Sequence, residues 1–156
     1  MKAAQSAGVK ISFGPSGSLE SRTATAAGRG MVAAMADLAA RLAAVKDRST
    51  LRITTRGRRT GKPHSVPIWF VADGTTLYLA TLNARRDWVR NVRRTPEVVL
   101  AMGDLGVRGR VSVVTDPALE GRIRELLAHK YWMAWIGSWF GMGPEATFRV
   151  DDLEVG

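Results

Sequence analysis

The chain has 156 residues, a length that suits one domain with a single sizeable core. It contains no cysteine, which excludes disulfides and thiolate chemistry, and its two histidines, His64 and His129, lie too far apart in sequence to indicate a metal site. Lysine and arginine number 23 against 14 acidic residues, and the formal charge of +9 favours an anionic partner such as nucleic acid, acidic lipid or a phosphorylated cofactor.

Residues 1–30 are rich in alanine, glycine, serine and threonine and show no sustained period, which is typical of a disordered leader. A start codon placed too early is the alternative, because Met31 and Met35 directly precede the first periodic segment. The leader lacks the apolar core of a secretory signal, and no apolar run in the chain reaches the ~20 residues that span a bilayer. We therefore expect a cytoplasmic protein whose functional domain is residues 31–156.

The first periodic segment, residues 31–46, is predicted to be a helix. Its apolar side chains recur at i, i+3, i+7 and i+10, and its high alanine content favours the same structure. These apolar residues are Met35, Leu38, Leu42 and Val45. From Leu51 to Arg56 the period changes to two, which indicates a strand.

A basic turn at residues 57–61 leads into a second predicted strand at 63–71. Pro67 lies inside this strand and has no amide hydrogen to donate, so it predicts a strand edge or a bulge. Asp73-Gly74 is a strong hairpin signal, and residues 76–81 are predicted to return as the third strand.

The second half of the chain is predicted to add two helices and three strands. Residues 85–94 form an arginine-rich helix that ends before Pro96, and Asp116 followed by proline is a typical helix start. The strands are expected at 97–102, 107–115 and 145–155. Six short, hairpin-linked strands with helices at the seams close into a barrel without exposed edges. We therefore predict a mainly β fold with peripheral helices, built as a six-stranded antiparallel barrel.

Conventional catalytic patterns are absent from the sequence. It holds no G-x-S-x-G elbow, no Walker loop and no G-x-G-x-x-G motif, and no pair of carboxylates lies in an apolar setting. If the protein is an enzyme, we expect a bound cofactor to carry the difficult chemistry.

The first candidate site is the turn at residues 56–62, Arg-Gly-Arg-Arg-Thr-Gly-Lys. Its four cations lie beside backbone amides and one hydroxyl, where glycines let the chain approach a ligand closely. Charge-assisted hydrogen bonds of this kind contribute ~1.5–3 kcal/mol each when partly desolvated, which suits a phosphate or a string of carboxylates. The alternative, favoured by composition alone, is a solvated hairpin tip.

Two further segments could line a pocket. Ser65, Pro67 and Trp69 share one face of the second strand, where a flat aromatic beside a proline suits a planar ring, although ordinary packing is the alternative. Residues 80–83 end the third strand before a helix, a place that presents amide donors and a positive dipole end to an anion. Trp88, three residues before Asn91, shares a helix face with it; the alternative is a core tryptophan and a local cap.

Together these segments resemble the deazaflavin-dependent nitroreductase family, which belongs to the pyridoxamine-phosphate-oxidase-like, FMN-binding split β-barrels. The resemblance covers roughly Leu51 to Met102. It rests on the order of the Gly-Arg-Arg-Thr-Gly turn, Val66-Pro67-Ile68-Trp69-Phe70, Asp73-Gly74, Trp88-x-x-Asn91 and Pro96.

The resemblance implies a homodimer that binds coenzyme F420, or FMN in related branches, at the subunit interface and transfers hydride to quinones, nitro compounds or other small acceptors. It implies that the phosphate or the polyglutamate tail is held by Arg58, Arg59, Thr60 and Lys62. The ring is then lined by Ser65, Pro67, Ile68 and Trp69, with backbone contacts from Ala80, Thr81 and Leu82. Trp88 and Asn91 complete the pocket.

The chain departs from the characteristic members between Leu82 and Asp87, where they carry Lys-Gly-Gly and a proline before the tryptophan. We expect Arg85 and Arg86 to substitute electrostatically, with a different cofactor as the alternative. The aromatic stretch 131–140 is interpreted as a pocket lid or dimer packing, and contact with a membrane surface is a minor alternative. Within it, Tyr131 is a weak candidate for a proton donor.

Two other functions stay open beside the F420- or FMN-dependent oxidoreductase. One is a non-catalytic barrel that stores or carries a flavin, a deazaflavin or haem with the same binding residues. The other is a nucleic-acid-binding barrel, which is disfavoured because the basic residues do not alternate with aromatics on a stacking strand.

Overall fold

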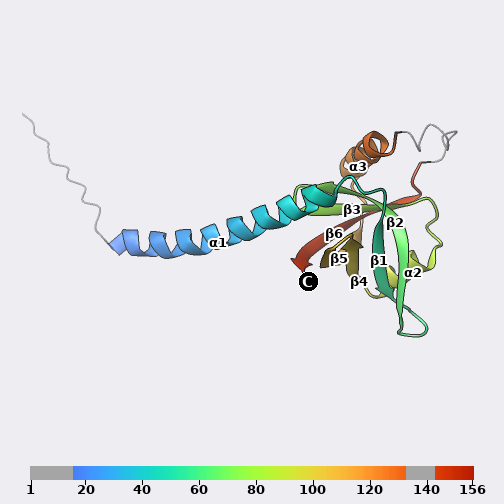
Figure 1. Ribbon diagram of the computed structural model, residues 1–156, viewed down its shortest axis with the longest axis horizontal. Helices are drawn as coiled ribbons and strands as arrows, with labels where there is room; N and C mark the ends of the chain where they lie inside the picture. Colours follow the sequence, from blue (N-terminus) through green and yellow to red (C-terminus); the bar gives the residue numbers. More distant parts are fainter. Residues whose placement is uncertain (1–15, 133–142) are drawn as a thin grey trace, which may run out of the picture. The chain divides into compact units, whose positions relative to one another are not determined.

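The structure is a computed structural model that describes residues 16–132 and 143–156. In this part of the chain six antiparallel strands form a closed barrel in the order β1-β2-β3-β6-β5-β4 (Figure 1). The strands are β1 (Leu51–Arg56), β2 (Pro63–Asp73), β3 (Thr76–Thr81), β4 (Glu97–Met102), β5 (Leu105–Val113) and β6 (Ala146–Val155). The predicted six-stranded antiparallel barrel is therefore confirmed, and each strand begins and ends within two residues of its expected bounds.

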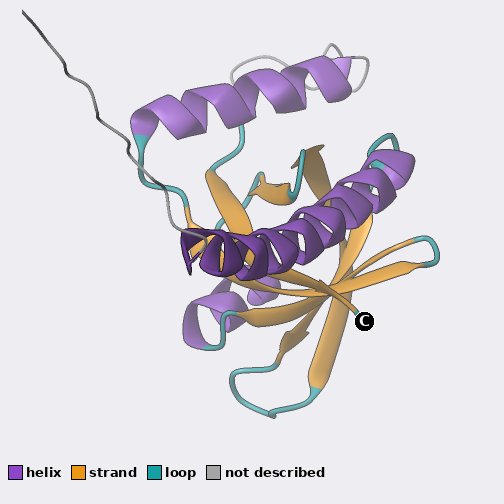
Figure 2. Cartoon of the chain, turned by 90° about the vertical axis from the view of Figure 1, so that its left-hand side faces the viewer, coloured by secondary structure: helices purple, strands orange, loops and turns teal. Residues whose placement is uncertain are grey.

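Two of the helices, α2 (Asp87–Arg94) and α3 (Pro117–Lys130), lie on the outside of the barrel (Figure 2). Helix α2 packs against β1, and α3 packs against β2. The start of α3 agrees with the predicted cap, because the Asp116 carboxylate accepts a hydrogen bond of 3.1 Å from the amide of Ala118. The described residues contain no helix that is long and apolar enough to cross a membrane.

Alternation along the strands builds the core. In β1 and β4 every second side chain is buried, and these side chains fill the barrel together with Phe70, Leu79 and Phe148, which are fully buried. Burying such a side chain contributes about 1.5–3 kcal/mol. A second apolar cluster lies between the outer face of the barrel and α3, where Ile123 and Leu127 pack. Apolar packing thus covers both faces of the second half of β2, from Ile68 to Val71, while the first half of the strand is mostly exposed.

Helix α1 (Ser16–Val45) begins at Ser16, whereas the sequence pattern predicted a helix from residue 31 and a disordered leader before it. Residues 16–30 show no sustained apolar period that would predict this part of the helix, and the side chains at positions 26–37 are exposed. Leu42 is buried in the barrel core, while Met35, which was placed on the same stripe, is 49% exposed. By its contacts the chain divides into two compact units, Met1–Ala36 and Asp37–Gly156.

Pro67 lies where β2 has one strand neighbour. Among the described strands, β2 pairs with β1 from Pro63 to Ile68, and with β3 from Trp69 to Asp73. The proline is therefore on the part of β2 whose β3 side is open, as the edge prediction requires. This opening in the ladder is what makes room for a site.

Candidate functional site

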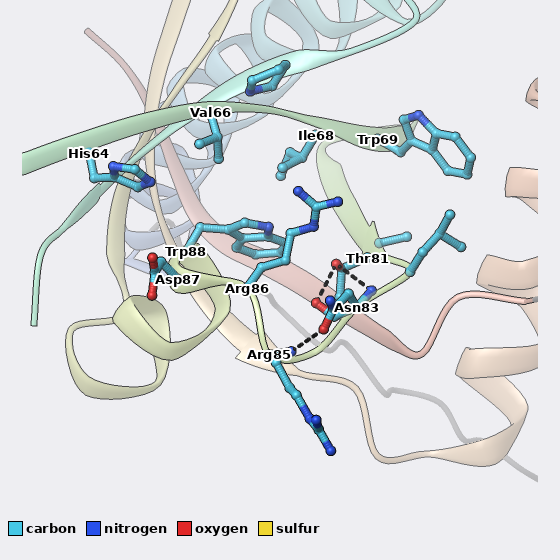
Figure 3. Close-up of a pocket in the computed structure, with 13 residues that line it drawn as sticks. His64, Val66, Ile68, Trp69, Thr81, Asn83, Arg85, Arg86, Asp87 and Trp88 are labelled. Atoms are coloured by element: carbon cyan, nitrogen blue, oxygen red, sulfur yellow. Dashed lines mark hydrogen bonds between the residues drawn. The ribbon is translucent and has the colours of Figure 1, made fainter.

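The opening beside β2 is a pocket of about 570 Å³ (Figure 3). It forms because β3 ends at Thr81, and residues 82–86 then swing away from the sheet toward α2 while the first half of β2 continues past them. Its volume is in the range of about 300–1,000 Å³ that small-molecule sites usually have. We call it the ring pocket.

The walls of the ring pocket come from two elements that face each other. His64, Val66 and Ile68 point into it from one face of β2, and the indole of Trp88 lies opposite, at the start of α2 (Figure 3). Trp88 is 2% exposed and packs edge-on against Phe148, with ring centroids 5.2 Å apart and an angle of 62°. The indole is thus a core residue and also a fixed flat wall of the pocket, so the pocket interpretation of Trp88 and the core interpretation are compatible.

The turn at Thr81–Arg86 does not offer the free amides that its position in the sequence suggested. The Asn83 amide donates to Thr81 Oγ1 at 3.1 Å, and the Arg85 amide donates to Asn83 Oδ1 at 2.8 Å. The Ala84 amide donates to Glu145 Oε2 at 2.9 Å, and the Arg86 amide to the Asn83 carbonyl at 3.3 Å. These four donors are already satisfied within the protein, so they are not free to bind a ligand.

The two arginines of this turn differ in direction. Arg86 extends into the ring pocket, beneath Ile68 and beside the Trp88 indole, whereas Arg85 points away from it (Figure 3). Arg86 is therefore the cation that this pocket presents to a bound molecule.

The basic turn forms a second hollow of about 260 Å³ next to the first. Its backbone is closed by a 2.8 Å hydrogen bond from the Gly57 amide to the Lys62 carbonyl and another of 2.8 Å from the Gly61 amide to the Gly57 carbonyl. Gly61 has a φ of +69°, and a Cβ at Gly57 would lie 2.7 Å from Thr60 Oγ1, so both glycines are needed for this compact turn. We call this hollow the basic hollow.

Asn91 clamps the basic turn to α2. Its side chain is 2% exposed; Nδ2 donates to Thr55 Oγ1 at 3.0 Å, and Oδ1 accepts from the Arg58 amide at 3.2 Å and from Arg58 Nη1 at 3.3 Å. Arg58 Nη1 also donates to Asp87 Oδ1 at 3.0 Å, and this hydrogen bond and charge lower the pKa of the Asp87 carboxyl. Arg58 is therefore held by the protein, while Arg59 and Lys62 are exposed cations at the hollow.

The two hollows meet. His64 and Asp87 line both of them, although they come from different elements and lie far apart in the sequence. A ligand with a flat apolar part and an anionic tail therefore finds both kinds of surface side by side.

The structure distributes the sequence-predicted site residues as follows. The ring pocket is lined by Pro67, Ile68, Trp69, Ala80, Thr81, Leu82, Arg85, Arg86 and Trp88. The basic hollow is lined by Arg58, Arg59, Thr60, Lys62 and Asn91. Ser65 lines neither, and its Oγ lies 2.6 Å from Thr54 Oγ1 on β1.

Tyr131, the candidate proton donor, does not line the two hollows either. Its hydroxyl lies 2.7 Å from the Ser49 carbonyl and 3.0 Å from the Phe70 carbonyl, and burial raises the pKa of this phenol. Its ring stacks on Trp69 with centroids 5.2 Å apart, so Tyr131 supports a pocket residue from behind. The rest of the aromatic stretch interpreted as a lid, residues 133–140, lies outside the described residues.

Sequence reasoning gave no site role to three residues that line the ring pocket, His64, Val66 and Asp87, whereas Asn83 belongs to the predicted segment 80–83. The signal for His64 was available, because period two along β2 places it on the same face as Val66 and Ile68. Asp87 carried no such signal, since its role depends on contact with Arg58 across the fold.

Comparison with models of protein families gives a match over most of the chain. The family model described as pyridoxamine 5'-phosphate oxidase matches residues 38–155. The search of curated proteins found no match.

Solved structures share the fold at low identity. A candidate pyridoxamine 5'-phosphate oxidase from Listeria innocua has a TM-score of 0.53 and 21% identity, covering 73% of this chain and 93% of its own. An F420-H2-dependent reductase has a TM-score of 0.52 and 19% identity, covering 67% and 95%. A candidate 5-nitroimidazole antibiotic resistance protein from Bacteroides thetaiotaomicron has a TM-score of 0.53 and 14% identity, covering 72% and 80%. At these identities the likeness establishes the split-barrel fold.

Proposed function

The chain belongs to the pyridoxamine 5'-phosphate oxidase family, and from that premise we propose that it is an oxidoreductase that uses coenzyme F420, or alternatively FMN, to reduce a small acceptor such as a quinone or a nitro compound. The observation that carries the proposal is the junction of an aromatic, apolar pocket with a basic hollow. Flavins and deazaflavins combine the matching features, a planar ring and a phosphate-bearing tail.

The residues present fit such a group. The ring pocket offers Val66 and Ile68 on one side and the fixed Trp88 indole on the other, between which a planar ring would lie. In the basic hollow, Arg59 and Lys62 are exposed donors for phosphate or carboxylate oxygens. The buried Asn91 amide keeps the turn that carries both cations in place.

The solved structures support a redox role without deciding the cofactor. One structural neighbour is named as an F420-H2-dependent reductase, and another is named for resistance to 5-nitroimidazoles. Both names concern those proteins, and they agree with a nitro compound as one acceptor class to be tested here.

When bound, the reduced coenzyme supplies the hydride; the chain's own residues bind, orient and balance charge. Trp88 and Ile68 would hold the ring, and this contact would position the reacting atoms. Arg59 and Lys62 neutralise the tail. Arg86, which extends into the pocket, stabilises the negative charge that develops on an acceptor oxygen during reduction (Figure 3).

The first test is a fluorescence titration of the purified protein with coenzyme F420 and, in parallel, with FMN. The double variant Arg59→Ala, Lys62→Ala should bind the preferred coenzyme about tenfold or more weakly, since each tenfold corresponds to ~1.4 kcal/mol. Lys46→Ala removes an exposed lysine outside both hollows and should bind like the wild type. Failure to bind either coenzyme would refute the proposal.

Turnover is tested next, with reduced coenzyme and a quinone or a nitroimidazole as acceptor. Oxidation of the coenzyme that depends on the acceptor supports the oxidoreductase. Tight binding without turnover of any acceptor would instead favour a barrel that stores or carries the coenzyme.

A further inference from the structure

We propose that His64 is the proton donor that completes reduction of the acceptor in the ring pocket. The inference rests on the proposed function and deepens it, because it assigns the one chemical role in that reaction that the coenzyme and the binding residues leave open.

The position of His64 is suited to this role. It lies on β2, on the face that carries Val66 and Ile68, and its imidazole points into the ring pocket opposite the start of α2 (Figure 3). It lines the ring pocket and the basic hollow at once, so it stands where the two meet. Its side chain is also exposed, which lets it regain a proton from water after each turnover.

The other ionisable residues of the ring pocket are poor proton donors. Arg85 and Arg86 keep their protons at any physiological pH. Asp87 is held as a carboxylate, because the hydrogen bond and the charge of Arg58 lower its pKa. Imidazole is the side chain that changes protonation between pH 5 and 8. Among the described residues that line this pocket, His64 is therefore the side chain whose chemistry suits a proton donor.

Charged groups surround His64 on two sides. From the α2 side the Asp87 carboxylate lines both hollows together with it. Arg86 at the same end of α2, and Arg58, Arg59 and Lys62 from the basic turn, carry positive charge. On β1, the Thr55 hydroxyl is 3.4 Å from the His64 carbonyl oxygen. Asp87 is thus an anionic side chain beside His64 in an otherwise cationic environment.

The reaction balances with one proton from His64. A quinone that receives a hydride gains two electrons and one hydrogen, which leaves an anionic oxygen. The imidazolium N–H bond breaks and an O–H bond forms on that oxygen, so that the products are the hydroquinone and neutral imidazole. The imidazole then takes a proton from solvent. General acid catalysis of this kind contributes about 10²–10⁴-fold in rate.

The kinetic test compares wild type with His64→Gln and with His129→Gln, a matched control on α3 that removes an exposed histidine outside both hollows. His64→Gln should lower kcat for quinone reduction by about 10²-fold or more. It should also abolish the fall of kcat at alkaline pH, while coenzyme affinity stays within about twofold. His129→Gln should match the wild type in all three measurements.

A second measurement needs no turnover. The imidazole protons of His64 are followed by NMR against pH in the protein without coenzyme, with His129→Gln used to assign the two histidines of the chain. The pH at which these signals change should coincide with the pH at which kcat of the wild type falls. A clear difference between the two pH values would contradict the donor role.

The outcomes separate the two proposals. Wild-type kcat and pH profile in His64→Gln would refute the proton donor and leave the oxidoreductase intact. A tenfold or greater loss of coenzyme affinity in His64→Gln would make His64 a binding residue and refute the donor role as well. Absence of any turnover in the wild type would refute the proposed function, and the donor role with it.

Discussion

Replacing Asn91 by alanine tests the clamp between the basic turn and α2. The substitution removes one hydrogen bond to Thr55 Oγ1 and two from Arg58 to a side chain that is 2% exposed. A typical hydrogen bond contributes about 1 kcal/mol net, so the three together amount to ~3 kcal/mol. We therefore expect Asn91→Ala to lower the free energy of unfolding by about 2–4 kcal/mol, since the buried Thr55 hydroxyl also loses its amide donor.

The assay is urea unfolding followed by tryptophan fluorescence, because the midpoint and slope together give the free energy of unfolding. Arg93→Ala, an exposed position on the same helix, should change it by less than ~0.5 kcal/mol. Thr55→Val combined with Asn91→Ala completes a double-mutant cycle, in which groups in contact couple by about 0.5–3 kcal/mol. A loss in Asn91→Ala that is no larger than in Arg93→Ala, or a coupling near zero, would refute the clamp.

Three further predictions concern Lys130, Tyr131 and assembly. Burial lowers the pKa of Lys130 from 10.5 to about 8, so between these pH values the unfolded chain binds more protons than the folded chain. The free energy of unfolding should therefore rise with pH in this range. In unfolding measured against pH, Lys130→Met should remove this rise and Lys46→Met should keep it. Tyr131→Phe keeps the stack on Trp69 but loses the hydroxyl contacts with the backbone. It should lower the free energy of unfolding by about 1–2 kcal/mol and leave the pH profile of turnover unchanged. An altered pH profile would restore Tyr131 as a candidate proton donor. Sedimentation velocity at micromolar concentration should give twice the chain mass of 16.9 kDa, as the family resemblance implies, and a monomer would contradict the expected homodimer.

Local pattern in the sequence determined most of the elements. Period two places Leu51, Ile53 and Thr55 on one side of β1, and the structure buries these three. Asp116 and Pro117 mark the first turn of α3, and Asp73-Gly74 marks the turn between β2 and β3, where Gly74 has a φ of +64°. Such signals are local, because a strand or a turn depends on the alternation and backbone freedom of a few neighbouring residues. The start of α1 was not predicted because residues 16–30 show no sustained apolar period.

The sequence predicted the candidate site as a set of segments, while the arrangement of the residues within it was decided by the tertiary structure. The resemblance pointed to residues of the basic turn, β2 and the start of α2. It could not show that the Ser65 hydroxyl contacts Thr54, or that His64 and Asp87 line both hollows. Nor could it show that the amides of residues 83–86 are already bonded, since one partner, Glu145, lies 61 positions away from Ala84. Periodicity reports which face of an element a residue occupies. Which residues meet across the barrel depends on strand register and on long-range contacts, and these exist once the chain has closed.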